Sequence, residues 1–178
     1  VLGGRLYAGD ESGAGEIGHT RVADDGGVCR CGSSGCLETV ASQRAVLARA
    51  RAEAESRSGW ALAGQDVDHE ALLAASRAGD PPARAIVLAS APPLGRIVGA
   101  MTGTLGARAR VLVGPMAAFG EPWLAQVRAD AERSALPLLV ARSTIHLGRT
   151  GDDVVELGAA AMLMTSELGL ALAASGAR

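Results

Sequence analysis

The stretch GEIGHTRVADDGGVCRCGSSGCLETVAS, residues 15–42, contains all three cysteines of the chain and one of its three histidines. The spacing is one histidine, nine residues, and then Cys-x-Cys-x4-Cys. Three thiolates and one imidazole form the closed four-ligand set of a structural zinc site. Glycines at positions 26, 27, 32 and 35 allow the tight backbone turns that such a site needs. We therefore predict a structural zinc ion held by His19, Cys29, Cys31 and Cys36.

Two other uses of the cysteines fit less well. An iron–sulfur cluster normally takes four cysteine ligands, and the chain has three. A disulfide would leave one thiol over, and nothing in the sequence suggests secretion. A closed four-ligand site has no coordination position for a substrate, so we expect the metal to fix a loop rather than to catalyse.

Two glutamates bracket the cluster. Glu16 lies three residues before His19, and Glu38 follows Cys36 by two. A metal-bound imidazole presents its second nitrogen as a donor of fixed tautomer. Carboxylates beside such a donor would suit a polyhydroxylated ligand. The alternative is that both glutamates are surface or helix N-terminal charges, and spacing alone does not choose between these interpretations.

Composition narrows the function classes. The 178 residues are 48% hydrophobic and 20% charged, with a net charge of −2, which is typical of a globular domain. There is no lysine, which excludes a Schiff-base or P-loop lysine within these residues. No basic run indicates a nucleic-acid groove, and no segment has the apolar character of a signal peptide or membrane span. We expect a cytoplasmic protein.

The remaining pattern alternates helices and strands. Two short strands are expected about Gly3-Gly4, so the chain begins within a hairpin and reads as a fragment. Pro92-Pro93 should break a helix that begins at Pro81. The other expected elements are helices at 37–57, 69–78, 94–103, 121–135 and 152–172 (capped by Asp152 or Asp153), a short buried strand at 108–115, and a strand at 141–148. This order predicts an α/β fold whose last two strands are parallel.

The stretch that opened this section closely resembles the zinc-loop signature of the ROK family of repressors and sugar kinases. The elements that match are Glu-x-Gly-His at 16–19, Cys-x-Cys-Gly-x-x-Gly-Cys at 29–36 and the Leu-Glu that follows. The segment GDDVVELGAAAML, residues 151–163, is similar to the closing helix of the family.

The resemblance implies an actin-like (ribonuclease-H-like) sugar kinase fold. The chain would be its C-terminal lobe, with a hairpin and zinc/sugar loop at 1–36 and helices with an α/β core at 37–178; the N-terminal lobe and any winged helix-turn-helix would lie outside it. The four predicted zinc ligands match those of the family. Its sugar-hydroxyl contacts would correspond to Glu16, His19 and Glu38.

Some elements of the family's kinases are not found here. Their Asp-x-Gly phosphate loop and Asn-Asp catalytic base would precede residue 1, so we expect no catalytic residue and no kinase activity in these residues alone. Pro115 replaces the second glycine of a pair that nucleotide approaches in the kinases. The proline removes an N–H and stiffens the backbone there.

The interpretation favoured by these observations is the effector-binding lobe of a ROK transcriptional regulator. It would respond to a sugar or sugar phosphate, reach DNA through an upstream domain, and act as a homodimer. The alternative is an ATP-dependent hexose or N-acyl-hexosamine kinase using ATP and Mg²⁺, with its catalytic aspartate in the N-terminal half. A third interpretation is a sugar-binding or structural remnant with neither activity.

Overall fold

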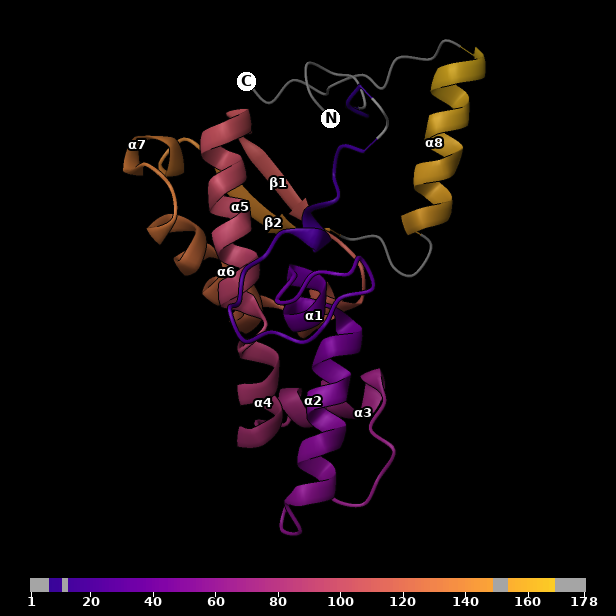
Figure 1. The fold of residues 1–178 in the computed structure, drawn as a ribbon, viewed down its shortest axis with the longest axis vertical. Helices are drawn as coiled ribbons and strands as arrows, with labels where there is room; N and C mark the ends of the chain where they lie inside the picture. The colour runs from indigo at the N-terminus through magenta and orange to yellow at the C-terminus, as the bar shows by residue number, and fades with distance from the viewer. Residues whose placement is uncertain (1–6, 11–12, 149–153, 169–178) are drawn as a thin grey trace. The chain divides into compact units, whose positions relative to one another are not determined.

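The computed structural model describes residues 7–10, 13–148 and 154–168 of the chain. The chain divides into two compact units, one formed by Val1–Glu16 with Thr150–Arg178 and the other by Ile17–Arg149. The second unit contains helices α1 to α7 and both labelled strands, and α8 (Val154–Leu168) belongs to the first unit (Figure 1). The predicted last helix is confirmed by α8, whereas the turn at Gly3-Gly4 and the cap at Asp152 or Asp153 lie outside the described residues.

The second unit begins with a short 3₁₀ helix η1 (Ile17–His19), followed by the cysteine-containing loop and two helices, α1 (Leu37–Ala41) and α2 (Gln43–Ser56). The expectation of one continuous helix over 37–57 is wrong at Ser42, whose backbone is extended at φ −69° and ψ 156°. The Ser42 hydroxyl accepts a hydrogen bond from the Ala45 N–H at 3.2 Å, so it caps α2 and begins a new helix.

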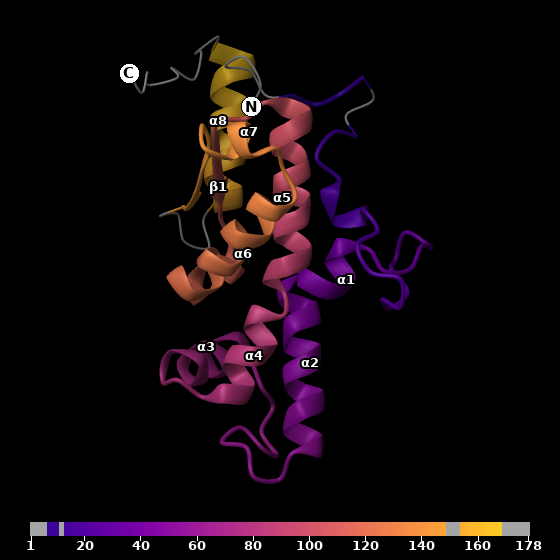
Figure 2. The same cartoon turned by 90° about the vertical axis from the view of Figure 1, so that its left-hand side faces the viewer.

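Two capped helices follow. Asp68 caps α3 (His69–Arg77) as predicted, and Asp80 caps α4 (Pro81–Leu88), whose prolines occupy the first turn. The Asp80 carboxylate also accepts a hydrogen bond from Trp60 Nε1 at 2.7 Å. Helices α2, α3 and α4 lie together in Figure 2 and enclose an apolar core. Its most deeply buried members include Val46, Ala50, Val67, Leu72, Ala83 and Val87.

The predicted break near Pro92-Pro93 is confirmed: α4 ends at Leu88 and α5 (Ala91–Leu105) begins with both prolines in its first turns. Helix α5 packs closely along α6 (Glu121–Arg133), as Figures 1 and 2 both show. A Cβ at Gly95 would lie 2.5 Å from the Asp130 Cβ, and one at Gly99 would lie 2.6 Å from the Ala131 carbonyl oxygen. Glycine at these positions therefore permits the close approach.

Among the described residues, the segment Pro81–Leu105 has the length and the apolar composition that a membrane-crossing helix would need. This is weak evidence for a membrane span, because the core helices of a folded domain pass the same test. The stretch is divided into α4 and α5, and its buried side chains contribute to the core described above.

Strands β1 (Ala109–Leu112) and β2 (Thr144–Leu147) pair in parallel, as predicted, with Arg110 opposite Ile145. The expectation that the first of these strands is buried is wrong, because Val111 is 57% exposed. Among the described residues, one face of the pair is covered, where Ile145 packs with Val98 of α5 and Leu124 of α6. Two further elements, η2 (Pro115–Phe119) and α7 (Pro137–Val140), were not predicted; both are short helices that begin at a proline.

Candidate metal and sugar site

The cysteine-containing loop returns on itself between η1 and α1. Isolated antiparallel bridges join Arg21 to Cys36 and Val28 to Ser34. The ends of the loop are closed by a hydrogen bond from the Leu37 N–H to the Thr20 carbonyl at 2.9 Å. This backbone pairing brings residues that are ten or more positions apart in the sequence to one point.

Gly35 limits how tightly the loop can fold. Gly35 has φ +70°, and a Cβ there would lie 1.8 Å from the Ala23 carbonyl oxygen, closer than any contact allows. Its own carbonyl accepts hydrogen bonds from the Val22 N–H at 2.8 Å and the Ala23 N–H at 3.2 Å. The close approach of these two strands of the loop is therefore possible only without a side chain at Gly35.

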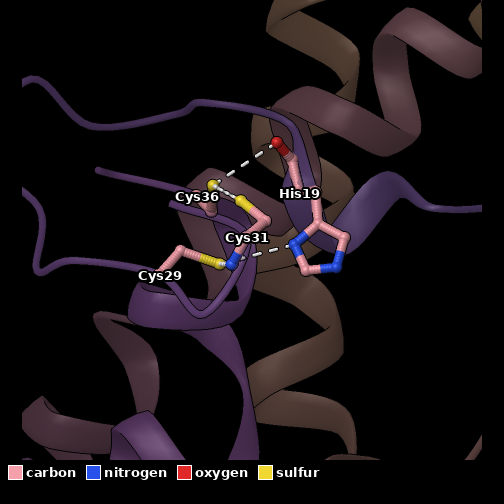
Figure 3. Close-up of side chains that lie close together, drawn as sticks. All are labelled: His19, Cys29, Cys31 and Cys36. Atoms are coloured by element: carbon pink, nitrogen blue, oxygen red, sulfur yellow. Dashed lines mark hydrogen bonds between the residues drawn. The ribbon is translucent and has the colours of Figure 1, made fainter. Parts of the chain in front are cut away.

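The four predicted ligands are brought together. Their ligand atoms all lie within 4.8 Å of one another: His19 nitrogen and the sulfurs of Cys29, Cys31 and Cys36 (Figure 3). Cys31 Sγ is 3.7 Å from Cys36 Sγ, and Cys29 Sγ is 3.4 Å from His19 Nδ1. A tetrahedral zinc ion with Zn–S bonds of about 2.3 Å would hold its sulfurs about 3.8 Å apart. The donor set thus fits a tetrahedral metal in both chemistry and spacing.

The thiols differ in protonation. The pKa of Cys31 is lowered to about 6, first by a backbone hydrogen bond at Ser33 and then by the Cys29 thiol. The backbone N–H of Cys31 lowers the pKa of Cys29, but hydrogen bonding to the Glu38 carboxylate and burial outweigh this and raise it to about 12. Burial raises the pKa of Cys36. Since metal binds thiolates, loading such a site releases protons from the buried pair.

Glu38 lies directly against the four ligands. Its Oε1 accepts a hydrogen bond from Cys29 Sγ at 3.0 Å and lies 3.6 Å from Arg30 Nε, and its side chain is 18% exposed. The hydrogen bond from Cys29 lowers the pKa of Glu38 against the effect of burial, with the charge of Arg30 contributing. Glu38 also lies in the first turn of α1, so its role as a helix N-terminal charge holds alongside its place in this cluster.

His19 directs Nδ1 toward the Cys29 sulfur, and Figure 3 shows Nε2 on the far side of the ring from the sulfurs. Glu16, the third predicted sugar contact, is exposed and belongs to the first unit, whereas His19 and Glu38 belong to the second. The structure therefore brings His19 and Glu38 together, and the role of Glu16 stays a prediction.

Two arginines that the sequence did not indicate also lie at this site. Arg30 lies between Cys29 and Cys31 in the sequence, and its side chain faces Glu38. An arginine at this position does not by itself indicate such a contact. Arg96 of α5 donates from Nη2 to the Val22 carbonyl at 3.1 Å and so ties the loop to the helix. A contact across 74 residues has no local sequence pattern that could have indicated it.

The carboxyl end of β1 is the second place of interest. The strand leads into Gly114, at φ +92°, and Pro115 then begins η2. Ligands of α/β proteins bind outside the carboxyl ends of parallel strands, where backbone N–H groups can meet phosphates. Pro115 offers no N–H at this point.

The chain is similar in sequence to proteins of one known family. The model of the ROK family matches residues 1–166. An N-acetylmannosamine kinase of Salmonella heidelberg is 34% identical over 160 residues, which cover 90% of this chain and 50% of the kinase. The chain spans about a third to a half of the length of the curated relatives it matches.

Solved structures give the same picture. A ROK family transcriptional regulator, described as a homologue of the Escherichia coli MLC protein, superposes with a TM-score of 0.77 at 25% identity over 83% of this chain and 37% of its own. A ROK family glucokinase from Streptomyces griseus, solved with glucose and AMPPNP, also superposes with a TM-score of 0.77 at 25% identity, over 91% of this chain and 55% of its own. These likenesses confirm the predicted α/β, actin-like sugar kinase fold.

Proposed function

The chain belongs to the ROK family, and from this premise we propose that it is the sugar-binding effector lobe of a transcriptional regulator that responds to a sugar or sugar phosphate. The solved regulator and the glucose-bound glucokinase are both similar to it, so the family premise alone supports sugar binding without deciding between regulation and catalysis. The residues of the metal loop and of the β1 end supply the remaining arguments.

The proposed sugar contacts are made by groups that the loop positions. His19, Cys29, Cys31 and Cys36 would hold a structural zinc ion, which supplies rigidity and no catalytic step. With Nδ1 on the metal side, His19 keeps its proton on Nε2 and donates it to a sugar hydroxyl. The Glu38 carboxylate accepts from neighbouring hydroxyls, and Glu16 would add a further acceptor by family resemblance.

The observation that carries the choice of a regulator is Pro115 at the carboxyl end of β1. By family resemblance, the nucleotide of a kinase would approach the backbone there, and a proline removes one backbone donor. In a regulator no nucleotide is needed. Sugar binding would instead shift the balance between two conformations of a two-lobed, cytoplasmic homodimer, and so move DNA-binding domains that lie outside these 178 residues.

The second candidate is an ATP-dependent kinase of a hexose or N-acyl-hexosamine. What favours it is the match to N-acetylmannosamine kinase over 90% of this chain. Such an enzyme would use ATP with Mg²⁺, and its catalytic aspartate would lie outside these residues.

Two variants of the intact protein test the sugar site. His19→Ala should lose metal and sugar affinity together, because the imidazole serves both. Glu38→Gln should weaken sugar binding about tenfold or more while keeping one metal per chain, since it removes only a charged acceptor. Metal content is measured by elemental analysis, and affinity by calorimetric titration with glucose, N-acetylglucosamine and N-acetylmannosamine.

A matched control is available in Glu70→Gln, because Glu70 occupies the same position in the first turn of α3 that Glu38 occupies in α1. The control should change neither readout. Full metal content in His19→Ala would show that the ligand assignment is wrong, and unchanged sugar affinity in Glu38→Gln would remove Glu38 from the site.

A further inference from the structure

Two neighbouring cavities open at the amino ends of β1 and β2, between the end of α5 and α7. Their volumes are about 260 and 200 Å³, and both are lined by Thr102 and Ser143. Arg110 lines the first cavity, and Arg108 and Arg142 line the second. We call these five residues the arginine pocket. All of them belong to the second unit.

Hydrogen bonds hold Arg110 in a fixed position beside the two hydroxyl-bearing residues of this pocket. Its Nη1 donates to Thr102 Oγ1 and to the Ala107 carbonyl, and its Nη2 donates to Ser143 Oγ at 2.7 Å. The two hydroxyls direct their own protons away, Thr102 to the Val98 carbonyl at 3.0 Å and Ser143 to the Val140 carbonyl at 3.1 Å. They therefore present only lone pairs to the guanidinium. These hydrogen bonds fix the orientation of the positively charged Arg110 guanidinium.

Among the residues that the structure describes, no carboxylate pairs with the charge of Arg110. None of the ion pairs among the described residues includes Arg110, and its Nε is buried without a hydrogen-bond acceptor. Burial lowers the pKa of the guanidinium below its ordinary value, although an arginine remains charged at neutral pH. By contrast, Arg128, which also lines the first cavity, pairs with Glu121. A partly buried cation whose hydrogen bonds go to neutral oxygens favours an anion as a further partner.

The neighbouring arginines add to this charge. Arg108 and Arg142 are exposed, and neither takes part in an ion pair among the residues that the structure describes. No acidic residue lines the second cavity, and Glu132 is the one acid lining the first. Three arginines with no ion pair among the described residues thus line two cavities, and both cavities are also lined by the hydroxyl-bearing residues Thr102 and Ser143.

The arginine pocket is separate from the places already described. The Thr144 N–H donates to the Arg108 carbonyl at 2.7 Å where the two strands begin, so the pocket lies at their amino ends. Gly114 and Pro115 follow the carboxyl end of β1, at the opposite edge of the sheet, and the metal loop precedes α1. Neither the proposed sugar contacts nor the turn at Pro115 line either cavity.

We propose that the arginine pocket binds the phosphate group of a small phosphorylated molecule. Guanidinium forks match the oxygens of phosphate in bidentate geometry. Three unpaired arginines suit a dianion better than the single charge of a carboxylate. The volumes admit a small molecule rather than a polymer. This site is independent of the proposed sugar site and could report a phosphorylated metabolite to either a regulator or a kinase.

Calorimetric titration of the intact protein with inorganic phosphate tests this proposal, with acetate at the same ionic strength as the monoanion control. Phosphate should bind with a Kd below about 10 mM, and acetate should bind at least tenfold more weakly. Arg110→Gln and Arg142→Gln should each weaken phosphate binding about tenfold or more. Thermal unfolding will show whether Arg110→Gln is still folded. If it is not, Arg142→Gln still tests the proposal, because Arg142 is exposed and its substitution should not affect folding.

Arg84→Gln is the matched control, because Arg84 is exposed and lines neither cavity. It should bind phosphate as the unaltered protein does, and so should Glu38→Gln. Absence of phosphate binding, or equal affinity in the Arg142 and Arg84 variants, would overturn the proposal. Loss of phosphate binding in Glu38→Gln would also overturn it, since the anion would then occupy the sugar site.

Discussion

Substitution of Gly35 by alanine should open the metal loop. The alanine Cβ would lie 1.8 Å from the Ala23 carbonyl oxygen, so one of the two backbone segments must move. Movement breaks the hydrogen bonds that the Gly35 carbonyl accepts from the N–H groups of Val22 and Ala23. The bridge between Arg21 and Cys36 lies beside these bonds, so the displacement reaches a metal ligand directly.

Two contributions make up the expected loss of stability of the closed loop in Gly35→Ala. An alanine in the left-handed region costs about 1–2 kcal/mol. Each broken backbone hydrogen bond adds about 0.5–1.5 kcal/mol. Together these weaken the closed loop by about 2–5 kcal/mol, which corresponds to a loss of metal affinity from about 30-fold to a few thousandfold.

Gly32→Ala separates the two contributions. Gly32 lies in the same loop at φ +89°, but a Cβ there meets no atom within 4 Å. It should therefore cost only the conformational part, or about 5- to 30-fold in affinity. Competition with a chelating zinc indicator measures both variants. Equal losses in Gly35→Ala and Gly32→Ala, within about threefold, would refute the argument from the close approach.

Two further predictions concern stability, measured by denaturant unfolding. Gly95→Ala should destabilise the second unit by about 1–3 kcal/mol, because its Cβ would lie 2.5 Å from the Asp130 Cβ. Gly103→Ala in the same helix meets no atom within 4 Å and should be neutral or stabilising by up to about 1 kcal/mol; equal effects would contradict the packing of α5 on α6. Leu72→Ala should cost about 2–5 kcal/mol because Leu72 is fully buried, whereas Leu136→Ala, at 68% exposure, should cost far less.

Local chemistry made much of the fold predictable. Aspartate caps and first-turn prolines lie within a few residues of the helices they begin, so the starts of α3 and α4 followed from the sequence. The spacing of the cysteines with His19 likewise indicated a four-ligand cluster, and the structure brings those four side chains together. The parallel pairing of the two strands followed from the helix between them.

Features that depend on distant partners were not predictable. In the sequence, Ser42 could be either a polar residue inside one long helix or the cap of a new helix. Which of the two it is depends on how α1 meets the loop. In the part of the chain that the structure describes, Val111 is exposed because α5 and α6 pack on the face of the sheet that carries Ile145, and a run of apolar residues does not reveal which face is covered. The arginine pocket joins residues from 102 to 143, and no short motif contains them.

The most direct test of the proposed function is whether the intact protein binds sugar without transferring phosphate. Calorimetric titration with sugars is combined with a coupled assay for ADP release from ATP and Mg²⁺. The regulator proposal predicts saturable sugar binding that Glu38→Gln weakens, no ADP release above background, and release from operator DNA on sugar addition. Sugar-dependent ADP release would contradict it and establish the kinase, with Pro115 tolerated at the nucleotide site.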